Sequence, residues 1–507
     1  MSPLPRAVSI ALVLVVLTIC ARIAWVCDDA YITFRTIDHW QLGYGPVWNI
    51  QERVQTYTHP LWMLLLTGTS LLTGELYFTA IGLGLLGATA TLVTLLRLEG
   101  AATTAPLLLV LGCSKAWTEF ATSGLENALS YTVIAGAVVT MSPRILSRPR
   151  QVAAALLLGL APLCRPDLAL VVSLPAALLV WTSRGWWPVL AAGLGPGLVW
   201  VAFATVYYGT PLPNTALAKL GHAPISQNLT QGLAYLRSSI QLDPALLPVT
   251  GLGLGLALAR SRKAPSMATF SLGGGLYLVY IVSIGGDFMS GRFLTVPFLL
   301  AVAILMSTGR RATWLVAPAA LALSLTSTAS PLRTTADFHV PNWDDAGIAD
   351  ERGWYYPHLG LVPILREGRD PPKPGRSKRP GEGRVRMGKA IGMDAYMSGP
   401  QIHLVDAYAL CDPLLARIPS DEILGRPGHW IRPVPRGYLE TLKTGQNLLA
   451  DPEVAALWAD VYLATRAPLW TPGRVQAIGR LLTYGRTAPI QGVPPMSRPP
   501  RTPPGDG

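Results

Sequence analysis

Long apolar segments alternate with short polar segments through the first two thirds of the chain. The first apolar segment, residues 8–26, has about the length that a helix needs to cross a bilayer. Ten more follow, at residues 59–97, 104–116, 128–141, 151–163, 168–182, 187–206, 245–259, 267–285, 293–308 and 312–329. The pattern predicts a polytopic α-helical membrane protein with about 11 transmembrane helices.

Short loops rich in Lys and Arg follow every second span. This pattern predicts that these loops and the N-terminus lie on the cytoplasmic side. Their basic residues are Arg6, Arg97, Arg144, Arg148, Arg150, Arg184, Arg260, Arg262, Lys263, Arg310 and Arg311. The stretch 59–97 is long enough for two helices, with a break at Thr73-Gly-Glu75. Because two full crossings there would reverse every later loop, we expect part of it to be interfacial or re-entrant.

The pattern changes after residue 329. We expect residues 1–329 to form a transmembrane module, with residues 27–58 as an external loop. Residues 330–490 are mixed and Pro-rich, which predicts a C-terminal mixed α/β domain outside the cytoplasm. The remaining Pro/Arg/Gly segment, residues 491–507, is typical of a disordered tail.

Composition excludes an ordinary soluble enzyme. Half of the 507 residues are hydrophobic, only 14% are charged, and mean hydropathy is +0.37. Much of the net charge of +12 lies in residues 366–389, which carry nine basic and three acidic residues. This run is either solvated or lies on anionic lipid heads, so the expected partner is a bilayer and not nucleic acid. The five scattered cysteines have no metal-binding or disulfide spacing.

The adjacent acids Asp28 and Asp29 directly follow the first apolar segment. Ionised carboxylates are costly in hydrocarbon, so this pair must lie at the membrane surface. There it is a candidate general base for chemistry on a lipid-borne substrate, whereas the simpler alternative is the start of a solvated loop.

Most of the other unusual polar residues fall on the same predicted face. They are Glu126, Arg165, Asp167, Asn214, Lys219, His222, Asp287 and Arg292. Simpler roles remain open, with Glu126 as a helix cap and Arg165–Asp167 and Asp287–Arg292 as mutual ion pairs. Together they predict a cavity with acids on one part and cations on another, which suits a lipid with an anionic phosphate head.

Several segments resemble the GT-C superfamily of polytopic glycosyltransferases that use polyprenyl-phosphate sugars. Asp28-Asp-Ala-Tyr-Ile-Thr-Phe-Arg35 and the segment from Glu52 to Trp62 resemble its first external loop. Five further segments resemble its arabinofuranosyltransferase-like branch: Ser123-Gly-Leu-Glu126, Arg165-Pro-Asp167, Tyr208 to Gly221, Gly285 to Pro297, and Asp406 to Arg417 with Gly428-His429 after it. Within this branch the segments resemble the mycobacterial terminal β-(1→2)-arabinofuranosyltransferases and related bacterial enzymes, although the C-terminal region is short for that group.

The resemblance implies transfer of a sugar, arabinofuranose in this branch, from a polyprenyl-phosphate donor to a cell-envelope glycan acceptor. The reaction would occur on the outer face of a bacterial plasma membrane. Asp28 would be the base with Asp29 as helper, and a single displacement would invert the anomeric centre, although a retaining route stays open. No cofactor is required, a divalent cation is compatible with the acids, and the oligomeric state is open.

The resemblance also implies ligand contacts for the other polar residues. The residues expected to bind the donor phosphate are His59, Arg165, Lys219 and Arg292. Acceptor or sugar binding falls to Glu126, Asn214, His222, Asp287 and His429. In the C-terminal region the aromatic run Trp354-Tyr-Tyr356 is a further candidate for the acceptor, with core packing as the alternative.

A transporter or flippase of a lipid-linked sugar precursor is the competing hypothesis. Such a protein would share the spans and the charged cavity. Transporters, however, usually have polar breaks at mid-membrane and internal repeats. Here the polar residues gather at one predicted surface, which favours the glycosyltransferase.

The predicted topology can be tested with single cysteines in a cysteine-free background. Cysteines at positions 28, 165 and 292 should react with an impermeant maleimide added to intact cells. Cysteines at positions 150 and 262 should react only after permeabilisation. Labelling of positions 28 and 292 from opposite compartments would contradict a shared site.

Overall fold

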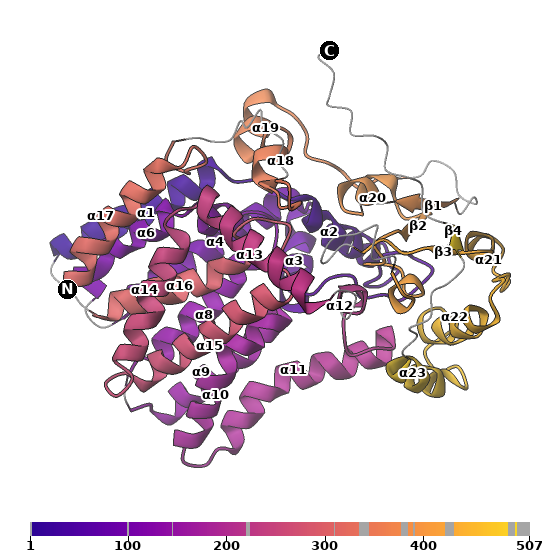
Figure 1. The fold of residues 1–507 in the computed structure, drawn as a ribbon, viewed down its shortest axis with the longest axis horizontal. Coiled ribbons are helices and arrows are strands. Elements are labelled where there is room, and N and C mark those ends of the chain that lie inside the picture. The colour runs from indigo at the N-terminus through magenta and orange to yellow at the C-terminus, as the bar shows by residue number, and fades with distance from the viewer. Residues whose placement is uncertain are drawn as a thin grey trace. The chain divides into compact units, whose positions relative to one another are not determined.

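The computed structural model describes residues 3–98, 101–143, 145–219, 224–308, 310–333, 344–376, 384–388, 391–420, 430–484 and 492–493, and is mostly helical (Figure 1). It divides into two compact units that interleave along the sequence. The first comprises Met1–Ala30, Thr58–Trp200 and Pro224–Lys373. The second comprises Tyr31–Tyr57, Val201–Ala223 and Pro374–Gly507, whereas the sequence pattern predicted boundaries after residues 329 and 490.

Helices make up the first unit. They are α1 Pro3–Arg22, α3 Pro60–Thr73, α4 Tyr77–Leu95, α5 Ala101–Thr104, η1 Ala105–Leu107, α6 Leu108–Cys113, α7 Lys115–Phe120, α8 Asn127–Met141, α9 Arg148–Cys164, η2 Pro166–Leu168, α10 Ala169–Thr182, α13 Ile225–Leu242, α14 Leu246–Ala259, α15 Pro265–Ser283, η3 Arg292–Leu294, α16 Thr295–Thr308, α17 Arg310–Thr326, α18 Glu351–Leu359 and α19 Leu361–Glu367. Two further helices, α2 Asp28–Gln41 and α11 Trp187–Tyr208, contain residues of both units.

Among the described residues, three helices are long and apolar enough to cross a membrane, namely α4, α11 and α15. The pair α13 and α14, bent by 107° at the short break between them, would make a fourth if it is one span. Shorter apolar segments occur at Pro60–Thr73, Asn127–Met141, Pro166–Thr182, Arg292–Thr308 and Thr313–Thr326. These elements fit a membrane protein.

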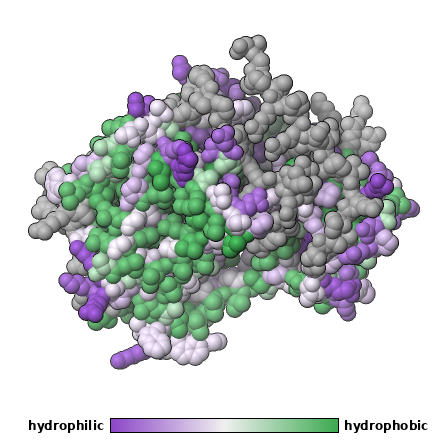
Figure 2. Space-filling view, viewed as in Figure 1, coloured by the Kyte–Doolittle hydropathy of each residue, from purple (hydrophilic) through white to green (hydrophobic). Residues whose placement is uncertain are grey.

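Apolar side chains also cover the outside of the first unit. Figure 2 shows them over much of the visible face of its helices. On α15, for example, Leu272, Leu276 and Val279 are 48%, 49% and 69% exposed. Soluble proteins rarely expose such a continuous apolar surface, so lipid is the expected neighbour.

Small residues let the helices of the first unit approach closely. A Cβ added at Gly253 of α14 would lie 2.5 Å from the Cβ of Ala301 in α16. One added at Gly273 of α15 would lie 2.3 Å from the carbonyl oxygen of Val171 in α10. Such close contacts between helix backbones are typical of membrane helix packing.

Three local predictions can be compared with these elements. The break at Thr73-Gly-Glu75 is confirmed, because α3 ends at Thr73 and is capped by Gly74, whose φ of 75° is left-handed, before α4 begins. The segment expected as one span, residues 104–116, divides among short elements from α5 to α7, and its crossing of the membrane stays a prediction. The segment expected as an external loop, residues 27–58, begins with a helix, α2, and its position outside the membrane stays a prediction.

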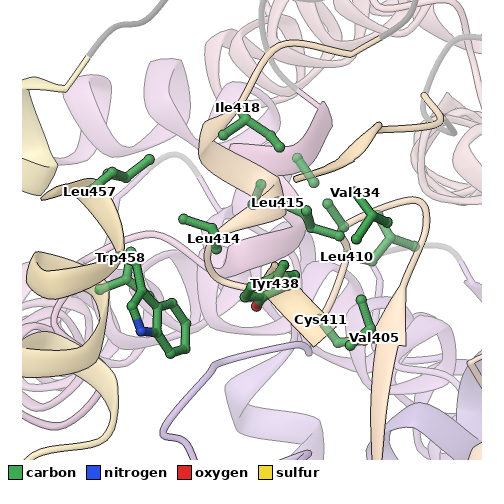
Figure 3. Close-up of a cluster of buried hydrophobic side chains, with 14 of the residues drawn as sticks. Val405, Leu410, Cys411, Leu414, Leu415, Ile418, Val434, Tyr438, Leu457 and Trp458 are labelled. Atoms are coloured by element: carbon green, nitrogen blue, oxygen red, sulfur yellow. The ribbon is translucent and has the colours of Figure 1, made fainter. Parts of the chain in front are cut away.

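The second unit surrounds a separate apolar core (Figure 3). Its elements are α12 Asn214–Lys219, β1 Arg384–Gly388, α20 Met393–Ser398, β2 Ile402–Asp406, η4 Leu415–Arg417, β3 Val434–Pro435, α21 Tyr438–Thr444, α22 Pro452–Thr465, α23 Arg474–Thr483 and β4 Gly492–Val493. Strands β1 and β2 pair in parallel, while β3 and β4 pair antiparallel. Val405, Leu414, Tyr438 and Trp458 point into the shared core.

Buried polar groups tie distant segments of the second unit together. The guanidinium of Arg35 in α2 donates hydrogen bonds to the carbonyls of Trp48, Ala395, Gly399 and Ile402. Arg35 is 1% exposed, so these bonds replace the water that its charge loses on burial. The segment after the acid pair is thereby joined to the C-terminal part of this unit.

The close contact between α14 and α16 predicts a site-specific loss of stability. Gly253→Ala should destabilise the protein by about 1–3 kcal/mol, because the new methyl overlaps Ala301. Gly255→Ala on the same helix is the matched control, because nothing lies within 4 Å of its added Cβ. Thermal unfolding in detergent would measure both, and equal midpoints for the two variants would contradict this packing.

Candidate functional site

The acid pair lies in the first turn of α2, where carboxylates interact favourably with the helix dipole. Two backbone bonds fix the residues just before it. The amide of Cys27 donates to the carbonyl of Ser123 at 3.0 Å, and the amide of Val26 to that of Leu359 at 3.2 Å. The Asp29 side chain is 33% exposed, so the acids are held in place and still reachable.

A buried carboxylate, Glu126, lies among basic groups behind the acid pair. Its oxygens are 3.1 Å from Nδ1 of His59, 3.3 Å from Nη2 of Arg292 and 3.8 Å from Nε of Arg165. The side chain is 1% exposed. Glu126 occupies the N-cap position of α8, but its side chain makes no capping hydrogen bond.

Arg292 connects the buried Glu126 to the partly exposed Asp29. Its Nη1 lies 3.7 Å from Oδ2 of Asp29 and 3.6 Å from Oδ2 of Asp287. The Nε of Arg292 is buried and has no hydrogen-bond partner among the described residues. The Arg292 guanidinium thus contacts three carboxylates and keeps one N–H group that can donate a hydrogen bond to a ligand oxygen.

Glycines around Arg292 permit this arrangement. Gly286 has a φ of 72°, and a Cβ there would lie 2.5 Å from the side chain of Tyr235. Gly291 has a φ of 76°, and a Cβ there would lie 2.7 Å from that of Ala116. Both positions combine left-handed backbone with close neighbours, so any side chain would displace the turn that carries Arg292.

Arg165 and Asp167 form the ion pair that the sequence left open. Nη2 of Arg165 donates to Oδ2 of Asp167 at 2.5 Å, and the hydroxyl of Tyr277 donates to the same oxygen at 3.2 Å. The Arg165 guanidinium also lies 4.1 Å from the ring centroid of Phe293. Because it reaches Glu126 as well, Arg165 extends the charged cluster.

Electrostatics keep the central acid ionised. Burial alone would raise the pKa of Glu126, but Arg292, then His59 and Arg165, more than offset it and hold that pKa well below its ordinary value. Acids and cations therefore alternate in this cluster, whereas the sequence predicted separate acidic and cationic parts. Glu126 is placed to position Arg292 and Arg165, and its contact with an acceptor stays a prediction.

Two other predicted ligand contacts belong to the second unit. The amide of Asn214 is buried there and donates to the carbonyls of Ala409, Leu410 and Asp412 at 2.9, 3.2 and 3.2 Å. Lys219, the last residue of α12, is exposed. His222 and His429 lie outside the described residues.

No group of three or more His, Cys, Asp or Glu side chains within the described ranges could hold a metal ion. The first unit also holds a second set of buried charges that the sequence did not predict: Lys115, Glu119, Asp350 and Arg352. Lys115 and Glu119, one helical turn apart beside an apolar stretch, were the available signal, because isolated charges in such a setting must find partners.

The chain is similar to two curated enzymes, both described as terminal β-(1→2)-arabinofuranosyltransferases. It is 29% identical over 327 residues to one from Mycobacterium tuberculosis, covering 55% of this chain and 52% of the relative. It is 30% identical over 324 residues to one from Corynebacterium glutamicum, covering 54% of this chain and 46% of the relative. The chain thus spans about half the length of the curated relatives it matches.

The resemblance to arabinofuranosyltransferases is thereby confirmed over about half of the chain. No family model matches the sequence. No solved structure matches it either. The fold described above therefore rests on the chain's own elements.

Removing the central charge should destabilise the first unit. Glu126→Gln leaves Arg292 and Arg165 with less compensation and should lower the free energy of unfolding by about 3–5 kcal/mol. Glu367→Gln is the matched control, because its pair with Arg369 is 55% and 35% exposed and contributes about 0–1 kcal/mol. Chemical unfolding in detergent would measure both, and equal losses would contradict the central place of Glu126.

The wild type and Glu126→Gln should also differ in how their free energy of unfolding depends on pH. A depressed folded-state pKa means that Glu126 stabilises the protein fully above the ordinary value of 4.5 and loses this contribution as pH falls toward the folded value. The stability gap between the wild type and Glu126→Gln should therefore narrow steadily below about pH 4.5. A gap that stays constant down to pH 3 would contradict the assigned charge state.

Proposed function

We propose that the chain transfers a sugar, arabinofuranose, from a polyprenyl-phosphate donor to a hydroxyl of a cell-envelope glycan. In this proposal the site faces the outside of a bacterial plasma membrane. The similarity to enzymes named arabinofuranosyltransferases supports the reaction class. The observation that carries the proposal is the contact of partly exposed Asp29 with Arg292 within a buried charged cluster.

The chemistry needs a base and a stabilised leaving group. The acceptor oxygen forms a bond to the anomeric carbon of the donor sugar, while the bond from that carbon to the phosphate oxygen breaks. The acceptor proton passes to an aspartate, and polyprenyl phosphate departs with the bonding electron pair. Arg292, through its unused Nε–H, and Arg165 would stabilise the phosphate charge.

Asp28 is the better candidate for the base. Successive residues of a helix point in directions about 100° apart, so the two acids point in different directions. An oxygen of Asp29 lies 3.7 Å from Arg292, which favours a role for Asp29 in holding that arginine. Asp28 then takes the acceptor proton, and Asp29 keeps Arg292 directed toward the phosphate.

The finer architecture belongs to the same proposal. A GT-C fold with about 11 crossings would need the shorter apolar helices to span together with their flanking residues. The apolar surface of the first unit and the five shorter apolar segments support such an arrangement. Lys219, His222 and His429 would join the donor or acceptor contacts, and a divalent cation would bind near the acids only if the donor phosphate supplied further ligands.

Transfer by purified protein tests the proposal. We expect transfer from polyprenyl-phosphate arabinofuranose to an arabinose-containing oligosaccharide. Asp28→Asn should lower kcat by about 100-fold or more, as loss of a general base does. Asp370→Asn is the matched control: its side chain is 77% exposed in a surface pair with Lys373, and its rate should stay unchanged.

The contrary outcomes are distinct. Absence of transfer from arabinose, mannose and aminoarabinose donors alike would contradict the proposed glycosyltransferase activity. Movement of the donor across liposomes without transfer would favour a flippase. Full activity in both Asp28→Asn and Asp29→Asn would contradict the mechanism while leaving the reaction in place.

A further inference from the structure

The C-terminal end of helix α18 is joined to the backbone just before the acid pair. The amide of Val26 donates to the carbonyl of Leu359 at 3.2 Å, and the amide of Leu361 to that of Ala24 at 2.8 Å. The hydroxyl of Tyr77 donates to the same Leu359 carbonyl at 2.9 Å. The end of α18 therefore keeps a fixed distance from Asp28.

Four buried charges fix the other end of α18. Nζ of Lys115 lies 2.5 Å from Oε2 of Glu119 and 3.0 Å from Oδ1 of Asp350. Nε of Arg352 lies 3.1 Å from the same Glu119 oxygen. Asp350 also accepts the amide of Gly353 at 3.0 Å and so caps the helix. Side chains at most 10% exposed make these contacts, so α18 is held rigidly at both ends.

Tyr355 lies one helical turn before Leu359, the residue of α18 whose carbonyl accepts the Val26 amide. Glu351, Tyr355 and Leu359 follow each other at intervals of four residues and therefore share a face. Glu351 is buried, while Tyr355 is half-buried. Burial and then the charge of Asp28 raise the pKa of Tyr355 well above its ordinary value, so its hydroxyl stays protonated and can donate a hydrogen bond.

The neighbouring aromatic residues have other environments. The ring of Trp354 is 60% exposed. Tyr356 is buried, and its hydroxyl donates to the carbonyl of Arg22. Of the run Trp354-Tyr-Tyr356, Tyr355 is therefore the residue that combines partial exposure with an electrostatic interaction with Asp28.

We propose that Tyr355 contacts the acceptor sugar whose hydroxyl is activated by the acid pair. This rests on the proposed function. A hydroxyl that gives its proton to Asp28 must come within about 2.6–3.2 Å of it, so its sugar ring must lie against the groups beside Asp28. Tyr355 offers that ring an aromatic face for its C–H groups and a hydroxyl for its oxygens.

Steady-state kinetics separate this contact from a general loss of structure. Tyr355→Ala should raise the acceptor KM roughly 3- to 10-fold, the range expected for one aromatic contact, and leave the donor KM unchanged. Tyr355→Phe keeps the ring and should show a smaller increase. Trp354→Ala, a larger truncation on an exposed part of the same helix, is the matched control and should change neither KM.

Acceptor binding to detergent-solubilised protein, measured calorimetrically with the oligosaccharide alone, gives a readout independent of transfer. Tyr355→Ala should weaken it by the same factor as the KM increase. Transfer by the wild type with no effect of Tyr355→Ala, or an equal effect of Trp354→Ala, overturns the inference and leaves the proposed function standing. Tyr355-dependent binding without transfer supports the inference while contradicting the proposed function, and absence of binding by the wild type overturns the inference.

Discussion

The charged cluster depends on one buried carboxylate shared by three basic groups. Glu126 is 1% exposed and lies within 3.8 Å of basic nitrogens of His59, Arg165 and Arg292. A lone buried charge would be very costly, and two buried arginines without an acid would be costlier still. Because Arg292 also reaches Asp29, this compensation determines where the reachable acid lies relative to the cations.

The sequence revealed the members of this cluster better than their arrangement. Isolated charges in an apolar chain must find partners, which is why Asp29, Glu126, Arg165 and Arg292 could be grouped without a structure. Their alternation could not be foreseen, because periodicity says nothing about which segments meet. The break at Gly74 was readable from a Gly beside a charge, whereas α2 was missed because its polar residues resemble those of a loop.

The interleaving of the two compact units along the chain explains why the sequence did not predict the domain boundaries. Segments 31–57 and 201–223 belong with the C-terminal part of the chain through contacts such as those of Arg35 and Asn214 with backbone carbonyls. Arg35 and Asn214 lie in motifs that the sequence alone assigns to a loop or to ligand binding. Residues that complete a fold and residues that bind substrate therefore occur side by side in the same segments.

In the proposed reaction the donor phosphate and the acid pair meet at Arg292. An experimental structure with a non-transferable polyprenyl-phosphate sugar tests it most directly. We expect a phosphate oxygen within hydrogen-bond distance of the Arg292 guanidinium, with the anomeric carbon facing Asp28. A donor phosphate bound away from Arg292, with the sugar remote from both aspartates, would contradict it.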